Sequence, residues 1–268
     1  HKEYRRQRQM CIRDSLYASN AARVHTIEGA FTMRLIYSIA WWLALPLVLL
    51  RLFVRGRKEP GYRQHIEERL GCYRSVSYDG FTPVLWVHAV SVGETRAAQP
   101  LIDALLTAYP THVILLTHMT PTGRATGKDL FGKQSRVIQS YLPYDTGWMV
   151  GRFLCAFKPR LCVLMETEVW PNVMAQCTKY QVPVALVNAR LSERSLKKGL
   201  KFPSLFVEAA AAMSCVAAQT ESDAARIRQL GAPSVHVTGS IKFDVVPPTA
   251  MLQLSLIHIS EPTRLRRI

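Results

Sequence analysis

The stretch VLWVHAVSVGETRAAQPLIDALL, Val84 to Leu106, contains the pattern that decides the fold. Its first part, Val84–His88, is an uninterrupted apolar run, which is typical of a strand buried on both faces. A short bend of small residues follows, and apolar residues then recur at helical spacing over 95–108. We predict a buried strand that leads directly into a helix, with the carboxylate of Glu94 at the junction.

The same alternation of strand and helix continues along the central part of the chain. Further apolar runs predict strands at 113–117, 137–142, 161–165, 182–187, 215–218 and 235–238. Helical patterns lie between most of them, at 147–157, 172–180 and 221–230, and the stretch 191–213 predicts a loop and one longer helix. Such alternation is typical of a parallel sheet covered by helices on both faces. We predict an α/β fold with a Rossmann-like parallel sheet over residues 59–248.

The composition indicates a folded and strongly basic protein. Hydrophobic residues make up 49% of the 268 residues, which is enough for a sizeable core and argues against global disorder. The formal net charge of +15 favours an acidic partner: a nucleic acid, an anionic membrane, or a phosphorylated or carboxylated substrate. Because basic and aromatic residues do not interleave as they do in nucleic-acid-stacking proteins, we predict no nucleic-acid partner.

The sequence lacks the common patterns of metal and cofactor sites. Its six cysteines form neither a CxxC pair nor a cysteine–histidine set at zinc spacing, and four of them lie in apolar or helical patterns typical of buried reduced thiols. Neither GxGxxG after the first strand nor GxxxxGK[ST] is present, which argues against a dinucleotide dehydrogenase and a P-loop enzyme. We predict a reducing compartment, no cofactor and no metal.

The two ends of the chain differ from its centre. Residues 1–32 and 249–268 are typical of translated vector sequence, so we interpret them as non-native and take Met33 as the start. From Leu35 to Leu50 the chain has no charge over about 16 residues, slightly fewer than the ~18–20 that usually cross a bilayer. A basic cluster follows at once, and such clusters stay on the cytoplasmic side. We predict a membrane anchor with a basic flank at 33–58; the alternative is a buried core helix.

Nearly every predicted strand is followed by a polar, turn-forming segment. Ligands of such sheets bind at the carboxyl ends of the strands, so these segments are where a site is expected. In the first, Ser91 and Glu94 have capping-box spacing, which alone explains a glutamate there. The same place would hold a general base rigidly, the helix dipole would keep it ionised, and Gly93 would let a substrate approach the backbone. Both interpretations stay open, and the spacing favours capping.

The segment METEVWPN puts two carboxylates beside a buried strand. Such groups are unfavourable there unless they are paired or used, which makes Glu166 a candidate site residue. Glu168 has an ordinary alternative role, because it could cap a helix that begins near Pro171.

Three other segments contribute candidate binding residues. Thr120, Thr122 and Gly123 could cradle an anion or form an ordinary turn. Arg190 could bind a phosphate or carboxylate, or be a solvated charge. Lys242 could balance the charge of a leaving phosphate, or be a surface lysine.

Taken in order, seven segments resemble the amino-terminal half of the 3-deoxy-D-manno-octulosonic acid (Kdo) transferase family. They are HAVSVGET, THMTPTG, YLPYD, METEVWPN, NARLSERS, AQTESDAARIRQLGA and GSIKFD. The earlier stretch RLFVRGRKEPGYRQHIEERLG is similar to the start of the family, and the match covers about Met33 to Pro248. One departure is His118, where the family pattern has threonine.

The resemblance implies the acceptor-side domain of a GT-B glycosyltransferase at the cytoplasmic face of a bacterial inner membrane. The implied reaction is the inverting, metal-independent transfer of Kdo from CMP-Kdo to lipid IVA in lipopolysaccharide biosynthesis. By motif position, Glu94 is implied as the proton acceptor, and Glu166 and Lys242 as stabilisers of the transition state. The family's carboxy-terminal donor domain has no counterpart after GSIKFDVVPP, so we expect the chain alone to be inactive.

Two other functions remain open at this point. The chain could belong to another GT-B sugar transferase of envelope synthesis, because donor choice depends on the second domain. It could also act as a non-catalytic, membrane-associated module that binds the acceptor.

Overall fold

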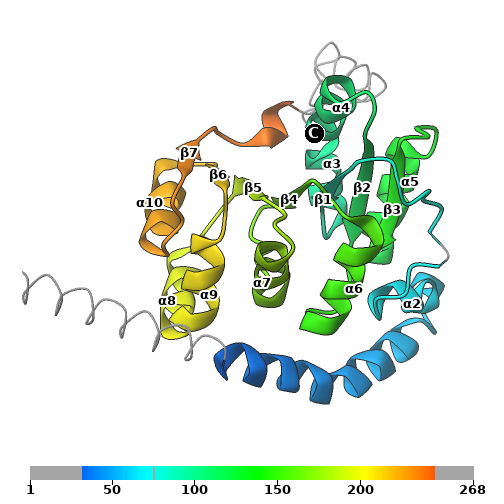
Figure 1. Cartoon of the computed structure of the whole chain (residues 1–268), viewed down its shortest axis with the longest axis horizontal. Coiled ribbons are helices and arrows are strands. Elements are labelled where there is room, and N and C mark those ends of the chain that lie inside the picture. The colour runs from blue at the N-terminus through cyan, green and yellow to red at the C-terminus, as the bar shows by residue number, and fades with distance from the viewer. Residues whose placement is uncertain (1–31, 75, 245–268) are drawn as a thin grey trace, which may run out of the picture.

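The computed structural model describes residues 32–74 and 76–244 as a parallel sheet with helices on both faces (Figure 1). The segments predicted to be non-native lie outside these residues, except for Thr32. Seven strands are hydrogen-bonded in the order β3-β2-β1-β4-β5-β6-β7, and every neighbouring pair is parallel. The strands are β1 (Val84–His88), β2 (Val113–His118), β3 (Val137–Tyr141), β4 (Leu161–Met165), β5 (Val184–Ala189), β6 (Cys215–Ala218) and β7 (Val235–Val237). This doubly wound order confirms the predicted Rossmann-like α/β fold.

Alternate residues of the inner strand β1 contribute to two separate cores. Leu85 and Val87 of β1 face one core, whereas Val84 and Trp86 face the other, as the two-residue period of a strand requires. The first core is covered by α3 (Val92–Ala97), α4 (Gln99–Ala108) and α5 (Pro121–Phe131). The second is covered by α6 (Gly147–Phe157), α7 (Pro171–Lys179), α9 (Pro203–Ala211) and α10 (Glu221–Gln229).

Two helix predictions are wrong, and proline is the reason in both. The predicted helix 95–108 is two helices, because Pro100 lacks an N–H and lies in the first turn of α4, just after α3 ends. The stretch 191–213 likewise contains α8 (Glu193–Lys201) and α9 rather than one longer helix, because Pro203 begins the second of them. The first break matters for the site, because it leaves Glu94 in the first turn of a helix of only six residues.

A short N-terminal segment fixes the start of α5. The η1 turn (Pro60–Arg63) leads to α2 (Ile66–Arg69), in which the Glu68 side chain is buried. Its carboxylate accepts a hydrogen bond from the Tyr141 backbone N–H (2.8 Å) and forms an ion pair with Arg124 of α5. This buried pair connects α2 to the end of β3 and to the first turns of α5.

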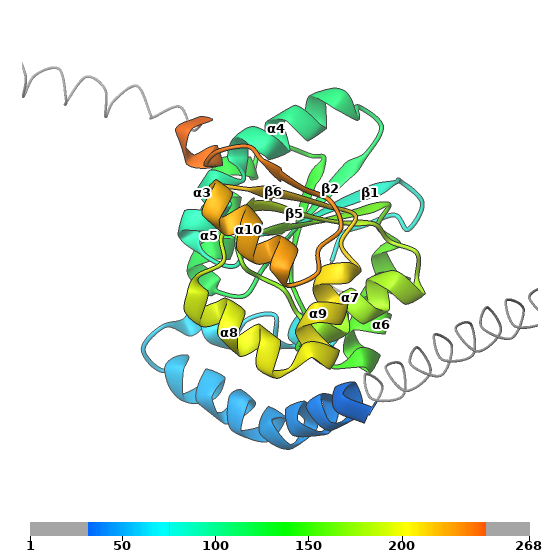
Figure 2. The same cartoon turned by 90° about the vertical axis from the view of Figure 1, so that its left-hand side faces the viewer.

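The N-terminal helix, Thr32–Arg55, is 24 residues long and has a mean hydropathy of 1.9. Among the described residues it is the one helix long and apolar enough to cross a membrane, although a signal sequence has the same properties. It continues through Pro46 without interruption. Figures 1 and 2 show it beneath the layer formed by α6, α7, α8 and α9.

The start of α7 is capped by a residue distant in sequence. Trp170 at the N-cap provides no side-chain hydrogen bond, and the Asp145 carboxylate instead accepts from the backbone N–H groups of Asn172 (3.1 Å) and Val173 (2.9 Å). Burial raises the pKa of Asp145 to about 6, and these hydrogen bonds oppose the shift. Asp145 therefore caps the start of α7, which is the role that the sequence suggested for Glu168.

We expect Asp145→Ala to lower the free energy of unfolding by about 1–3 kcal/mol, because two buried N–H groups lose their acceptor. Chemical denaturation in a mild detergent measures the change. Asp129→Ala, on the exposed side of α5, is the matched control and should change the value by less than about 0.5 kcal/mol. Equal losses in the two variants would contradict the capping role.

Candidate active site

Three glutamates and one lysine gather at the carboxyl ends of the central strands. Glu94 lies in α3 after β1, Glu166 and Glu168 follow β4, and Lys242 lies in η2 (Ile241–Asp244) after β7. We call these four residues the carboxylate cluster. Their charges influence one another, because the pKa of Glu94 responds to both Glu166 and Lys242, and the pKa of Glu168 responds to Glu94 and Glu166.

Glu94 is a helix cap and also a member of the cluster. The Ser91 side chain accepts from the Glu94 N–H (3.4 Å) and donates to its Oε1 (2.9 Å), and the Val90 N–H donates to Oε2 (2.9 Å). Half of the predicted capping box is present: Ser91 accepts from the Glu94 N–H, whereas the Glu94 carboxylate accepts from the Val90 N–H and the Ser91 hydroxyl rather than from the Ser91 N–H. Burial raises the pKa of the Glu94 carboxyl, Glu166 raises it further, and the bonds from Val90 and Ser91 and the charge of Lys242 lower it. The net direction is upward, because burial outweighs the hydrogen bonds and the lysine charge that favour ionisation.

Glu166 forms an ion pair with Lys242, whose Nζ lies 3.0 Å from Oε1. The backbone of Glu166 is left-handed, with φ 58°, at the point where β4 ends. Such a conformation costs about 1–3 kcal/mol in a residue other than glycine and is characteristic of functional sites. The structure thus brings together two residues that are 76 positions apart in the sequence and that were each singled out from it.

Asn188 holds this arrangement and was missed as a site residue. It is buried at the end of β5 and is also left-handed, with φ 57°. Its Nδ2 lies 3.5 Å from Glu166 Oε1, and its Oδ1 accepts from the Ile241 N–H (3.3 Å) and the Ser240 hydroxyl (3.4 Å). Asn188 therefore fixes the segment that carries Lys242. Its position as the first residue of NARLSERS was the available signal.

Glu168 is the second residue that the candidate list omitted. Burial raises its pKa to about 7, Glu94 and Glu166 raise it as well, and the Trp170 side chain lowers it. A carboxyl group with this pKa gains or loses a proton near neutral pH, unlike an ordinary glutamate. The signal in the sequence was its spacing from Glu166, with one residue between two carboxylates.

Thr120 and Gly123 build the wall beside Glu94. Thr120 is the N-cap of α5, where it accepts from the Gly123 N–H (3.1 Å) and donates to the Val90 carbonyl oxygen (3.0 Å). A Cβ on Gly123 would lie only 2.9 Å from that same oxygen. Both residues therefore hold α5 against the loop before α3. Thr122 is exposed, and its hydroxyl lies 3.4 Å from that of Thr120.

Gly93 and Arg190 lie on the surface near the cluster. A Cβ on Gly93 would meet nothing closer than the Ser91 hydroxyl at 4.0 Å, so the space above the first turn of α3 is open. Arg190 is exposed after β5 and lines a largely apolar cavity of about 290 Å³ together with Thr167 and Lys198.

His118, the departure from the family pattern, is buried behind the site. Its Nδ1–H donates to the Ala89 carbonyl oxygen (2.9 Å), and its Nε2 lies 3.0 Å from the Gln139 side chain. Burial lowers its pKa to about 4. A neutral imidazole therefore joins the ends of β1, β2 and β3 without reaching the carboxylate cluster.

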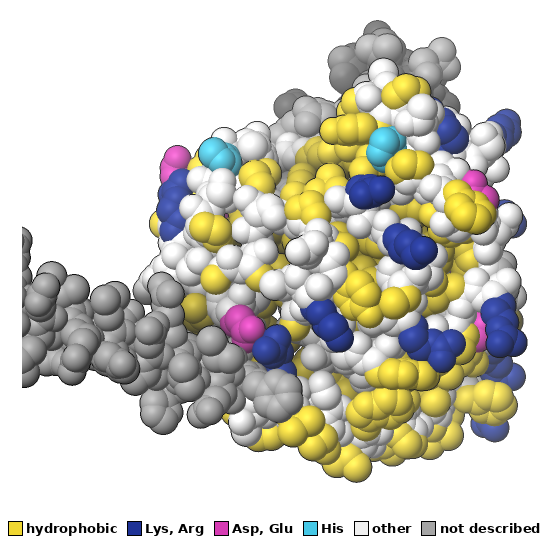
Figure 3. Space-filling view, viewed as in Figure 1, with side chains coloured by type: hydrophobic (Ala, Val, Ile, Leu, Met, Phe, Trp, Pro, Cys, Tyr) yellow, Lys and Arg dark blue, Asp and Glu magenta, His cyan; other side chains and the backbone are white. Residues whose placement is uncertain are grey.

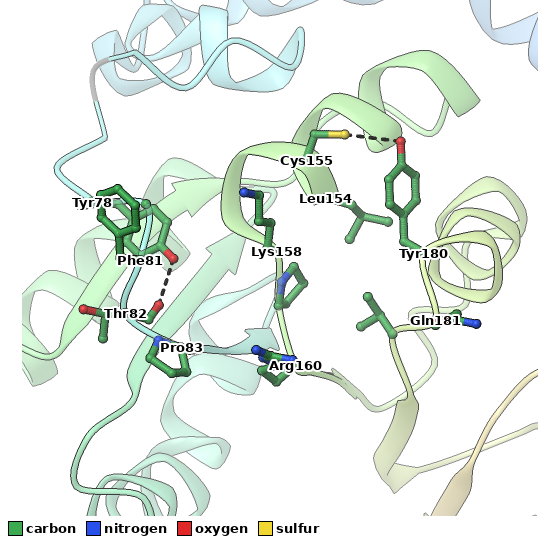
Figure 4. A pocket seen from close by; sticks show the side chains of 13 residues that line it. Tyr78, Phe81, Thr82, Pro83, Leu154, Cys155, Lys158, Arg160, Tyr180 and Gln181 are labelled. Carbon is green, nitrogen blue, oxygen red and sulfur yellow. Dashed lines mark hydrogen bonds between the residues drawn. The ribbon is translucent and has the colours of Figure 1, made fainter.

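A larger cavity, of about 640 Å³, lies at the opposite end of the sheet (Figure 4). Its lining includes Thr82, Pro83, Arg160 and Gln181, which come just before the strands β1, β4 and β5. None of the candidate site residues lines it. Within residues 32–74 and 76–244, no group of three His, Cys, Asp or Glu side chains is arranged to hold a metal ion.

The two glycines of the site should respond oppositely to alanine. Gly123→Ala should destabilise the fold by about 1–3 kcal/mol, because its Cβ collides with backbone and with the Thr120 side chain. Gly93→Ala should be neutral or stabilising by up to about 1 kcal/mol, because the new Cβ enters open space in a helix. Denaturation midpoints test both, and a similar loss in the two variants would contradict this geometry.

The ionisation of Glu168 should depend on its neighbours. We expect its carboxyl to titrate near pH 7, and Glu166→Gln or Glu94→Gln should lower that midpoint, because each removes a negative charge that opposes ionisation. Carbon-13 NMR of labelled glutamate carboxyls measures the midpoint. Glu221→Gln, exposed on α10, is the control and should leave it unchanged. If the titration midpoint of Glu168 stayed the same in both Glu166→Gln and Glu94→Gln, the three carboxylate charges would not be coupled.

Comparison with known proteins identifies relatives of the chain. The family model described as 3-Deoxy-D-manno-octulosonic-acid transferase (kdotransferase) matches residues 64–245. A 3-deoxy-D-manno-octulosonic acid transferase of Bordetella pertussis is 42% identical over 82% of this chain and 52% of its own length, and one of Haemophilus influenzae is 36% identical over 79% and 49%. The chain thus spans about half the length of the curated relatives it matches.

Solved structures resemble the chain at lower sequence identity. A UDP-GlcNAc 2-epimerase from Neisseria meningitidis bound to UDP-GlcNAc has a TM-score of 0.46 and 18% identity, over 66% of this chain and 51% of that chain. An S. aureus MnaA–UDP structure has a TM-score of 0.47 and 16% identity, over 65% and 51%.

The family model covers most of the described domain, and two relatives exceed 30% identity over more than two thirds of the chain. The chain therefore belongs to the 3-deoxy-D-manno-octulosonic-acid transferase family.

Proposed function

We propose that this chain is the acceptor-side half of a GT-B enzyme that transfers Kdo from CMP-Kdo to lipid IVA in lipopolysaccharide biosynthesis. The observation that carries the proposal is the carboxylate cluster: a buried glutamate with a raised pKa lies next to a glutamate–lysine ion pair. Family membership supports a glycosyltransferase, and the inverting, metal-independent reaction is part of the proposal.

Glu94 is the proton acceptor in this mechanism. The acceptor hydroxyl of the lipid attacks the anomeric carbon of Kdo, the bond from that carbon to the CMP phosphate oxygen breaks, and the hydroxyl proton passes to Glu94. Each carboxylate oxygen accepts one hydrogen bond in the free protein and keeps a second lone pair for the proton. A raised pKa makes this carboxylate a stronger base than an exposed glutamate.

Glu166 and Lys242 stabilise the charges that develop during transfer. The sugar gains positive charge as its bond to CMP breaks, and a carboxylate beside it favours that state. The leaving phosphate gains negative charge, and the Lys242 ammonium, whose side chain is half exposed, can approach it. Their 3.0 Å ion pair keeps both groups oriented before the substrates arrive.

The remaining candidate residues have binding or supporting roles in this proposal. Gly93 leaves room for the acceptor, and Thr122 and Arg190 offer exposed polar groups to its phosphates. Ser91, Thr120 and Gly123 hold the two helix starts around Glu94. The proposal assigns the binding of CMP-Kdo to a second, donor-side domain of the GT-B enzyme.

The proposed location is the cytoplasmic face of a bacterial inner membrane, with the N-terminal helix as the anchor. That helix is apolar, and basic residues follow it immediately. The basic residues after the helix suit both an anionic surface and a phosphorylated acceptor.

The hydrogen bonds between Glu94 and the start of α3 favour one alternative, in which Glu94 is structural and the chain only binds the acceptor. Glu94→Gln separates the two functions, because glutamine at N3 also completes a capping box but accepts no proton. In a polypeptide that continues this chain with the second half of the Bordetella pertussis relative, we expect kcat for Kdo transfer to lipid IVA to fall about 10²–10⁴-fold.

The free energy of unfolding should change by less than about 0.5 kcal/mol in this variant, as for a conservative change that keeps the cap. Glu193→Gln, exposed at the start of α8, is the control and should keep full turnover. Full turnover in Glu94→Gln would rule out Glu94 as the base and favour the scaffold role.

A further inference from the structure

The N-terminal helix contacts the domain along its whole length. Its less exposed residues recur every three or four positions and form one stripe, which includes Arg34, Tyr37, Ser38, Trp41, Leu45, Val48, Leu49 and Leu52. At the start of the stripe, Arg34 forms an ion pair with Glu208 of α9 (3.3 Å). One turn later, the Asn172 side chain of α7 donates to the Ser38 hydroxyl (3.1 Å).

The contacts continue to the other end of the helix. Trp41 stacks on Tyr144 with ring centroids 5.7 Å apart. Leu45 and Leu52 are buried in a small apolar cluster with Tyr144 and Met149. In Figure 1 the helix accordingly runs beneath the domain from α9 to α2.

The opposite face of the helix is apolar and exposed. Leu43 and Leu47 are 73% and 70% exposed, and they lie among similarly exposed apolar residues, which are Leu35, Ile36, Ile39, Trp42, Leu50, Phe53 and Val54. Figure 3 shows hydrophobic side chains along this lower edge of the molecule, with lysine and arginine side chains above them. The helix thus has one face for the domain and one for an apolar environment.

A helix held in this way cannot cross a bilayer while it stays docked. A crossing helix has lipid on all sides, so the docked domain would have to enter the hydrocarbon with it. That domain carries charges close to the helix, because Lys179 of α7 and Glu208 of α9 line one cavity together with Arg34. We infer that the N-terminal helix lies in the plane of an anionic membrane surface, with Leu43, Leu47 and their outward neighbours in the lipid and the domain on the water side.

The surrounding charges and aromatic rings specify an anionic lipid surface as the occupant. No Asp or Glu occurs between Thr32 and Lys58, whereas four cations lie at or just after the end of the helix, Arg51, Arg55, Arg57 and Lys58. The ring centroids of Trp42 and Trp148 are 6.3 Å apart, and tryptophan side chains are enriched at the level of the lipid headgroups. This inference deepens the proposed membrane location and does not depend on Kdo transfer.

Spin labels on the outward face distinguish the two orientations. The variants Ile36→Cys, Leu43→Cys, Leu47→Cys and Val54→Cys are labelled with a nitroxide after Cys11, Cys72, Cys155 and Cys215 have been changed to serine. Depth is measured in vesicles of phosphatidylethanolamine and phosphatidylglycerol from collisions with oxygen and with a water-soluble nickel complex. Phe81→Cys, on a loop with 92% of its side chain exposed, is the control and should stay in water.

We expect all four labels at one depth, about 5–10 Å below the headgroups. In a crossing helix the labels at Ile36 and Val54, about 27 Å apart along the helix axis, would instead lie near opposite membrane surfaces, and those at Leu43 and Leu47 would lie deepest. That profile would overturn the in-plane inference and keep the membrane location. Labels in water at all four positions would overturn both, and the Glu94→Gln experiment would still decide the chemistry.

A separate experiment tests whether the four cations at the end of the helix contribute to membrane binding. Changing Arg51, Arg55, Arg57 and Lys58 together to glutamine should weaken vesicle binding by about fivefold per charge, and only when phosphatidylglycerol is present. Equal binding before and after the change would overturn the assignment of an anionic surface.

Discussion

Mutual repulsion among three partly buried carboxylates is the constraint that organises this end of the molecule. Glu94, Glu166 and Glu168 influence one another's ionisation. Several negative charges placed so close together are unfavourable unless a positive charge or hydrogen-bond donors offset their repulsion. Lys242 provides the charge, and the backbone N–H of Val90 and the hydroxyl of Ser91 provide donors. The compensation is incomplete, because the pKa values of Glu94 and Glu168 remain raised.

The sheet topology explains how this cluster forms from distant segments. The parallel strands β1, β4 and β5 are neighbours, so the residues that follow them meet at one edge. The segment with Lys242 is held at that edge by the hydrogen bonds that Asn188 accepts from Ser240 and Ile241 and by the packing of Ile241 against the first core. Two left-handed residues, Glu166 and Asn188, redirect the chain at the strand ends and aim their side chains at each other.

Much of this could be predicted from the sequence, for identifiable physical reasons. Short apolar runs predicted all seven strands, most clearly β1, whose five residues are all buried. The residues after the strands predicted where Glu94, Glu166 and Lys242 would lie. Asn188 and Asp145 were not recognised as key residues, because each acts through backbone groups that are distant in sequence. The split of 95–108 was missed because the helical period continued across Pro100.

Because α3 is short, its dipole has little effect on the proton affinity of Glu94. A helix of six residues sums few peptide dipoles, so the field at its first turn is weak compared with that of a long helix. The affinity of Glu94 for a proton is therefore governed by water access and by the nearest donors and charges. Anything that excludes water from this turn, such as a docked glycolipid, would strengthen the base at the moment it is needed.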